Sequence, residues 1–90
     1  MTKTFDAPQI VVLDRGFIYA GRAEIADGFV TITQAQCVRR WGTTKGLGEL
    51  AAEGPKPRTV LDEAGTVVAP ISALVHLIGC NAAAWPHLAG

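Results

Sequence analysis

The stretch that decides the fold is Asp27-Gly28-Phe29-Val30-Thr31-Ile32-Thr33. Asp-Gly favours a tight turn, because glycine readily adopts the positive φ angles that such turns require. The residues after the turn alternate along an extended strand, so that Val30 and Ile32 lie on one face and the other three on the opposite face. A tight turn that leads into an alternating strand predicts a β-hairpin at this point of the chain.

Runs of apolar and β-branched residues recur on both sides of this stretch, separated by turn residues. Residues 9–13 form a continuous apolar run, which is typical of a buried strand. Glu63-Ala64-Gly65 separates two further runs and predicts the turn of a last hairpin. The strands expected from this pattern are 9–13, 17–22, 29–33, 37–41, 59–62 and 66–69.

The spacing of these strands indicates the fold class. Short strands that follow one another at about ten-residue intervals, with turns between them, are typical of small antiparallel barrels and sandwiches. The chain has 90 residues, which is the size of one small domain. We therefore predict a mainly β fold, a small antiparallel β-barrel or sandwich, formed by residues 1–90 as a single domain.

One short helix is expected near residues 47–53. Leu47, Leu50 and Ala51 occupy positions i, i+3 and i+4, so they share one helical face. Gly54-Pro55 ends this helix, since glycine is favoured just past a helix end and proline cannot continue the helix. A helix of about two turns is marginal alone, so its apolar face is expected to dock on the sheet.

The segment 71–78 has two interpretations. Its apolar residues fit a helical stripe with Pro70 at its start, and they also fit a single turn followed by a buried strand. The length of the segment and the hairpin expected before it favour the strand. In the tail, residues 81–90, Trp85 is the expected anchor.

Composition limits the classes of function. Hydrophobic residues make up 49% of the chain and charged residues 18%, which excludes a disordered protein. So much apolar surface in a small domain is expected to be buried against a second copy, so we predict a homo-oligomer. The eight basic and eight acidic residues cancel, and this neutrality argues against non-specific binding of nucleic acid.

Membrane and metal sites are not expected either. No apolar run approaches the roughly 18–20 residues that cross a bilayer, and residues 1–6 lack a signal-peptide core, so a cytoplasmic location without membrane partners is expected. Cys37 and Cys80 fit that location as reduced, buried small side chains rather than as a disulfide. Because metal ligands would be clustered, we predict neither a metal nor a cofactor.

The candidate ligand site lies between residues 39 and 50. Arginine forks bind phosphate oxygens, an indole ring stacks on a base, and free N–H groups at a helix start attract negative charge. A small anionic, nucleotide-like ligand is therefore one expectation for this stretch. The residues predicted to line the site are Arg39, Arg40, Trp41, Thr43, Thr44 and Lys45.

Two other interpretations of the same stretch stay open. In the purely structural one, Arg39 and Arg40 point to opposite faces of a strand, Trp41 caps the core, and the glycines only permit a tight turn. In the other, the stretch is a surface that contacts a host protein.

Formal motif matches do not indicate an enzyme. Gly46–Ala51 spells G-x-G-x-x-A, but that fingerprint requires a parallel strand and a full crossover helix, and here Gly54-Pro55 stops the helix. Residues 43–46 reverse the order of a phosphate-binding P-loop. His76 and His87 have no second ligand or carboxylate at a suitable spacing. We therefore predict that the protein is not an enzyme.

The sequence resembles a family of small uncharacterised proteins, known only as a domain of unknown function, that tailed bacteriophages and prophages encode. The likeness covers about residues 8–80. It implies a phage or prophage origin and action in the cytoplasm of an infected bacterium, but no activity and no catalytic residue. The segments that carry the resemblance are Asp14–Phe17, Arg39–Thr44, Gly46–Ala51, Gly54-Pro55 and Thr59–Asp62 through Gly65 to Pro70.

Together these observations predict a self-associating domain that acts by binding. It would sequester a nucleotide-like anion or contact a host protein. The alternative is a minor virion or assembly protein with a purely structural role.

Overall fold

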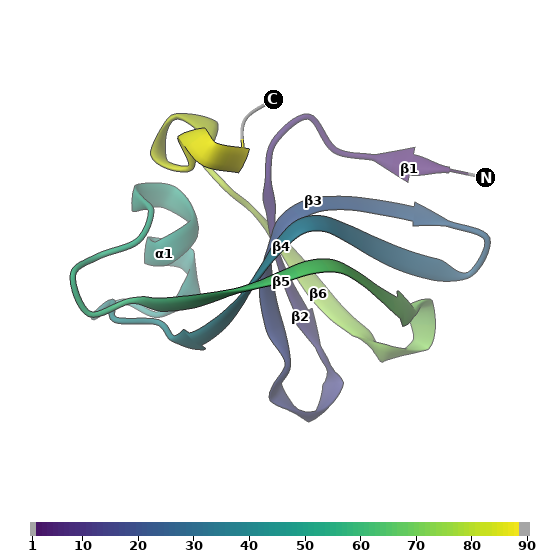
Figure 1. Ribbon diagram of the computed structural model, residues 1–90, viewed down its shortest axis with the longest axis horizontal. Coiled ribbons are helices and arrows are strands. Elements are labelled where there is room, and N and C mark those ends of the chain that lie inside the picture. The colour runs from purple at the N-terminus through teal and green to yellow at the C-terminus, as the bar shows by residue number, and fades with distance from the viewer. Residues whose placement is uncertain (1, 89–90) are drawn as a thin grey trace.

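The structure, a computed structural model, describes residues 2–88 and is mainly β with one short α-helix (Figure 1). The helix α1 spans Leu47–Glu53. The strands are β1 (Lys3–Thr4), β2 (Gln9–Leu13), β3 (Ile18–Ala26), β4 (Phe29–Arg40), β5 (Val60–Pro70) and β6 (Leu74–Gly79). Single 3₁₀ turns lie at Asp14–Gly16, Ile71–Ala73, Ala82–Ala84 and Pro86–Leu88.

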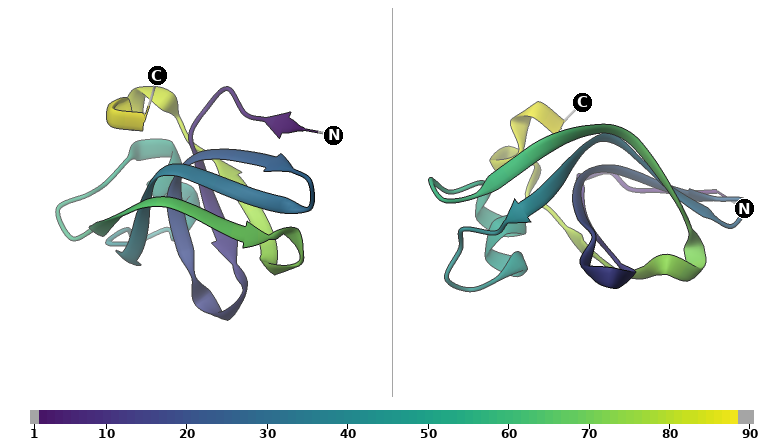
Figure 2. Two further views of the ribbon diagram at one scale, coloured as in Figure 1. Left: turned by 45° about the vertical axis from the view of Figure 1, so that its right-hand side comes forward. Right: turned by 60° about the horizontal axis from the view of Figure 1, so that its bottom comes forward.

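The strands form one antiparallel sheet in the order β5-β4-β3-β2-β6, and β1 pairs with the second half of β3. Figure 2 shows that the sheet curls strongly, and residues 71–73 carry the chain from β5 at one edge to β6 at the other. Among residues 2–88 no ladder pairs β5 with β6, so the sheet stays open. The predicted mainly β, antiparallel class is confirmed, whereas its closure into a barrel or sandwich is not.

The last hairpin predicted from the sequence is absent, and a single strand, β5, takes its place. Residues 60–70 form one strand, so the hairpin expected over 59–69 is wrong. The supposed turn at residues 63–65 is a bulge instead: Gly65, at φ 71°, pairs with Ala35, and the register shifts on both sides of this pair. A bulge inserts extra residues and bends a strand without reversing it, and turn-forming residues suit both structures.

β4 is also longer than expected. It joins the predicted strands 29–33 and 37–41 into one strand that ends at Arg40. Gln34, between the two, has φ 53°, a left-handed value that is uncommon for a residue other than glycine. It lies in the register shift between Ile32 and Ala35, directly beside the shift at which β5 has its extra residue, so the two strands bend in the same region. The strand expected at 17–22 likewise extends as β3 to Ala26.

Apolar residues pack on both faces of the curled sheet. In β2, Ile10 belongs to one cluster and Val11 to the other, and both are fully buried. The first cluster joins the sheet to α1 and the C-terminal segment: Ile10, Ala20, Val38, Leu50, Ala51, Cys80, Trp85 and Leu88. The second packs on the other face: Val11, Leu13, Ala23, Val30, Ile32, Ala35 and Ala69.

The elements predicted at α1 and β6 agree with the structure. α1 has the expected bounds and ends at Gly54, at φ 83°, whose N–H donates to Leu50 O at 2.9 Å. The segment 71–78 is a single turn followed by a strand, so the favoured strand is confirmed and the helix is wrong. The predicted burial of this strand is wrong: its residues are half-buried or exposed, because β6 lies at the edge of the sheet.

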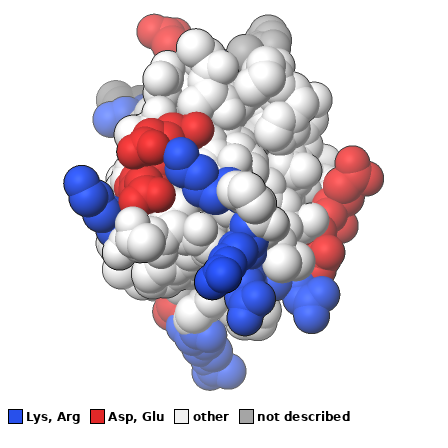
Figure 3. Space-filling model, turned by 90° about the vertical axis from the view of Figure 1, so that its left-hand side faces the viewer, with Lys and Arg blue, Asp and Glu red and all other residues white. Residues whose placement is uncertain are grey.

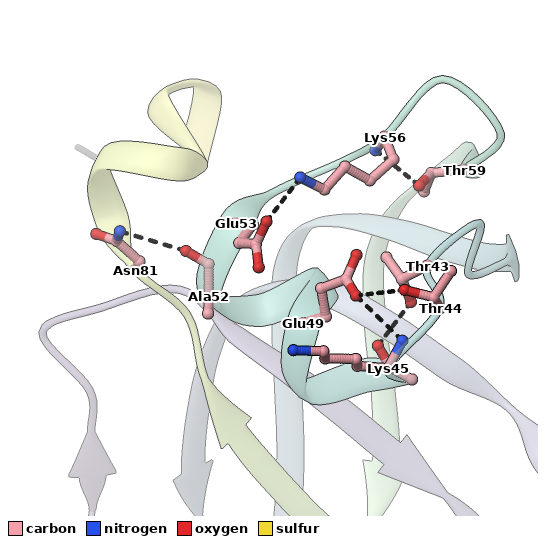
Figure 4. Close-up of polar contacts among 10 residues, drawn as sticks. Thr43, Thr44, Lys45, Glu49, Ala52, Glu53, Lys56, Thr59 and Asn81 are labelled. Carbon is pink, nitrogen blue, oxygen red and sulfur yellow. Dashed lines mark hydrogen bonds and ion pairs between the residues drawn. The ribbon is translucent and has the colours of Figure 1, made fainter.

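The segment after β6 closes over α1 and is held by Trp85. The Trp85 side chain is fully buried, and its Nε1–H donates to Ala51 O at 3.2 Å. The Asn81 N–H donates to the same carbonyl at 2.9 Å, and the Asn81 side chain donates to Ala52 O at 3.3 Å (Figure 4). These bonds satisfy carbonyls that a helix end leaves unpaired. The predicted anchor is therefore confirmed; residues 89 and 90 of the tail lie outside the described residues.

The two cysteines are free and differ in burial. The predicted burial is confirmed for Cys80, which lies in the core with 6% of its surface exposed, and is wrong for Cys37, which is only half-buried. Burial raises the pKa of the Cys80 thiol to about 11, although a backbone hydrogen bond with Ile10 acts in the opposite direction.

Cys80 should make the fold less stable at alkaline pH. The thiol loses its proton near pH 9.0 in the unfolded chain and near pH 11 in the fold, so in this window the folded state binds more protons. The free energy of unfolding should therefore fall as the pH rises through the window, and it should fall less steeply for Cys80→Ala. Urea unfolding at a series of pH values measures both slopes, and equal slopes would contradict this account.

Candidate functional site

Two loops meet at the end of the molecule where β4 stops and β5 begins. One loop connects β4 to α1, and the other connects α1 to β5. Gly42, at φ 70°, lies so close to the backbone of Arg58 and Thr59 that a Cβ would overlap it. The Thr59 hydroxyl donates to Trp41 O at 2.6 Å and fixes the same contact. This contact brings Arg58 beside the end of β4, where Arg40 lies.

A shallow depression of roughly 570 Å³ lies between the two loops. Its lining residues are Arg40, Gly42, Thr43, Thr44 and Arg58. Figure 3 shows several basic side chains on this end of the molecule, with acidic side chains on either side of them. Among residues 2–88, neither Arg40 nor Arg58 has an acidic partner within 4.0 Å. The depression therefore presents two unpaired positive charges. We call it the Arg40–Arg58 depression.

The two threonines of the depression stabilise the loop. The Thr43 hydroxyl donates to Gly46 O at 2.7 Å, and the Thr44 hydroxyl donates to Glu49 Oε1 at 3.1 Å (Figure 4). The same Glu49 oxygen accepts from the backbone N–H of Lys45 at 3.1 Å. Because both hydroxyl protons are engaged within the loop, the side-chain donors of the lining that stay available to an anion are those of the two guanidinium groups.

Three predicted site residues do not line the depression. Arg39 forms an ion pair with Asp62 at 3.0 Å, in which 66% and 51% of the two side chains are exposed. Solvent screens such a pair strongly, so it contributes little to stability. Trp41 is 43% exposed and borders Gly46, and Lys45 is exposed on the adjacent loop.

A second pair of charges next to the depression is already neutralised. Lys56 Nζ lies 2.8 Å from Glu53 Oε1, and this hydrogen bond lowers the pKa of Glu53 and raises that of Lys56 (Figure 4). Lys56 follows the helix and precedes Arg58 by two residues. Arg58 is thus the cation of this connection that has no carboxylate partner among the described residues.

Arg58 was missed by the sequence analysis. The sequence signal is a cation in the rigid segment Pro55-Lys56-Pro57-Arg58, just before β5. Nothing local connects it with Arg40, since the contact depends on Gly42 and Thr59 meeting across two loops.

A second depression, of about 330 Å³, lies at the paired bulges of β4 and β5. Its polar lining residues come from the bulges and the C-terminal turn, and two of them satisfy each other: His87 Nε2 and Gln36 Oε1 lie 2.7 Å apart. It holds a single formal charge, that of Glu63, so it does not match the predicted anion.

Within the described residues, no three His, Cys, Asp or Glu side chains gather as a metal site would require. The structure also contains no helix that is long and apolar enough to span a membrane, as far as residues 2–88 are concerned. Comparisons of the chain with protein-family models, with curated proteins and with solved structures gave no match.

Proposed function

We propose that this protein is a non-enzymatic binding domain that takes a small nucleotide-like anion between Arg40 and Arg58 and acts as a homo-oligomer. The observation that supports the ligand most directly is the shared position of two guanidinium groups without an acidic partner. Like charges held together repel one another, and an anion relieves this repulsion. Guanidinium groups also donate two parallel hydrogen bonds to phosphate oxygens, which favours phosphate as the charged part.

The position of Trp41 supports the proposal that the ligand is a nucleotide rather than a free phosphate. Trp41 stands between Arg40 and Gly42 in the sequence, and both of these residues line the depression. The residue is 43% exposed, and we propose that a base stacks on its indole ring. We assign the phosphates to the arginines and the base to Trp41.

Binding is proposed rather than catalysis because of the chemistry of the lining. Two guanidinium groups, two hydroxyls and a glycine offer no group that accepts a proton near neutral pH. The hydroxyls also donate within the loop, which leaves neither of them activated as a nucleophile.

The resemblance of the sequence to small phage and prophage proteins supports a role in the cytoplasm of an infected bacterium. There the domain would sequester a host nucleotide, or cover a host protein with the same basic surface. The second candidate function, a minor virion or assembly protein, is favoured by exposed apolar side chains such as Phe29 and Val68. Detection of the protein in purified virions would support the second candidate.

Calorimetric titration with nucleoside di- and triphosphates tests the ligand. Arg40→Ala and Arg58→Ala should each weaken binding by about tenfold or more, because a hydrogen bond to a charged group contributes roughly 1.5–3 kcal/mol. Arg15→Ala removes the same charge from the remote turn at Asp14–Gly16 and should leave the affinity unchanged. Absence of heat with every nucleotide, or an equal loss in all three variants, would contradict the proposal.

A further inference from the structure

The long edge of β5 has no partner in the sheet. β5 is 11 residues long and pairs with β4 on one side only. Such an edge presents unpaired N–H and C=O groups that another strand can pair with, and proteins usually protect it.

The hydrogen-bonding pattern between β4 and β5 determines which backbone groups of β5 point away from the sheet. The Ile71 N–H donates to Gly28 O at 2.9 Å, and Pro70, which has no N–H, stands opposite Phe29. In an antiparallel ladder the bonded positions alternate, so Ala69 and Val67 direct their backbone groups toward β4. Thr66 and Val68 therefore direct theirs away from the sheet.

The edge lacks the charges that normally prevent pairing. Residues 64–71 contain none; Pro70 protects the end of the strand, and the bulge at Gly65 limits the regular part of the edge to residues 66–70. Val68 is 58% exposed, and it stands opposite Thr31, next to the pair of Phe29 and Pro70. Phe29 is 49% exposed and Ile71 is 40% exposed, so the free edge is also apolar.

We propose that the free edge of β5 pairs with β5 of a second copy, antiparallel and about a two-fold axis near Val67 and Val68. This inference rests on the self-association part of the proposed function and not on the ligand. A two-fold axis places the same segment on both sides, so the uncharged residues 66–69 meet each other. Asp62 and Glu63 of one copy then face the uncharged residues 71–74 of the other, and no like charges meet.

A second copy is the occupant that this edge fits best. The pairing joins two sheets into one and brings Val68 and Phe29 of both copies together on the same face, where cross-strand apolar pairs stabilise a sheet. β6, the other edge strand, has 6 residues and is apolar apart from His76 in its middle, so a variant of β6 is the control that separates the two edges.

Sedimentation velocity over a range of concentrations tests this pairing. We expect the wild-type protein to be a dimer, and Val68→Lys and Val68→Pro to be monomers. The lysine puts like charges beside the axis, and the proline removes an outward N–H without breaking the bonds to β4. Val75→Lys is the matched control, because Val75 is also 58% exposed but lies on β6; this variant should remain a dimer.

Hydrogen exchange gives an independent readout. The Thr66 and Val68 amides should exchange at least about tenfold more slowly as the dimer forms, although neither has an acceptor in β4. A wild-type monomer at all concentrations would overturn self-association and leave the ligand proposal standing. A dimer that survives both Val68 variants, or one that Val75→Lys dissociates, would place the interface elsewhere and overturn this inference.

Discussion

Replacing Trp85 with alanine is expected to lower the free energy of unfolding by about 3–5 kcal/mol. The indole is the largest fully buried side chain of the described residues, and it packs with Leu50 and Ile10 between α1 and the sheet. Its loss leaves a cavity and removes the hydrogen bond from Nε1 to Ala51 O. For a domain of this size, each kcal/mol lowers Tm by roughly 4–8 °C.

The chain contains its own control for this experiment. Trp41→Ala removes the same side chain from a position that is 43% exposed, and it should cost less than about 1 kcal/mol. Trp85→Phe keeps most of the apolar volume but loses the hydrogen bond, so its cost should be intermediate. Urea unfolding followed by circular dichroism measures all three. Equal costs for Trp41→Ala and Trp85→Ala would contradict the assignment of Trp85 as the anchor.

Gly42→Ala is expected to destabilise the fold by about 2–5 kcal/mol. A positive φ costs a residue with a Cβ about 1–2 kcal/mol, and overpacking adds about 1–3 kcal/mol. At Gly42 both penalties apply, because φ is 70° and the new Cβ would overlap the Arg58 carbonyl carbon and the Thr59 nitrogen. The substitution should also separate Arg58 from Arg40 and weaken nucleotide binding.

Substitutions at two other glycines distinguish the cost of the positive φ from the cost of overpacking. Gly16 has φ 81° with nothing within 4 Å, so Gly16→Ala should show the conformational cost alone. Gly48 lies inside α1, also with nothing within 4 Å, and Gly48→Ala should stabilise the helix by about 0.5–1 kcal/mol. If Gly42→Ala costs no more than Gly16→Ala, the two loops are not held in contact by Gly42.

Local sequence signals predicted the elements that local physics determines. The alternation of Phe29–Thr33 predicted a strand with Val30 and Ile32 on one face, and the structure shows that this face is the buried one. The period of α1 and its stop at Gly54 depend only on neighbouring residues, so both predictions were correct. The anchor at Trp85 also follows from the size of its side chain.

The errors arise where distant residues decide the structure. Residues 63–65 are as suitable for a bulge as for a turn, and the choice depends on pairing with the bulge at Gln34 in another strand. The predicted site residues Arg40, Thr43 and Thr44 do line one depression, but its second guanidinium, Arg58, joins through a contact between loops that no spacing reveals.

The central claim is that the Arg40–Arg58 depression binds a nucleotide-like anion, and the NMR signals of the arginine side chains test it most directly. ¹H–¹⁵N NMR spectra of the arginine Nε–H groups, recorded during titration with a nucleoside triphosphate, distinguish each arginine. We predict that the Arg40 and Arg58 signals shift together and saturate, with the Gly42 amide, while the Arg15 signal stays in place. Signals that do not move, or that shift equally for every arginine without saturation, would contradict the claim.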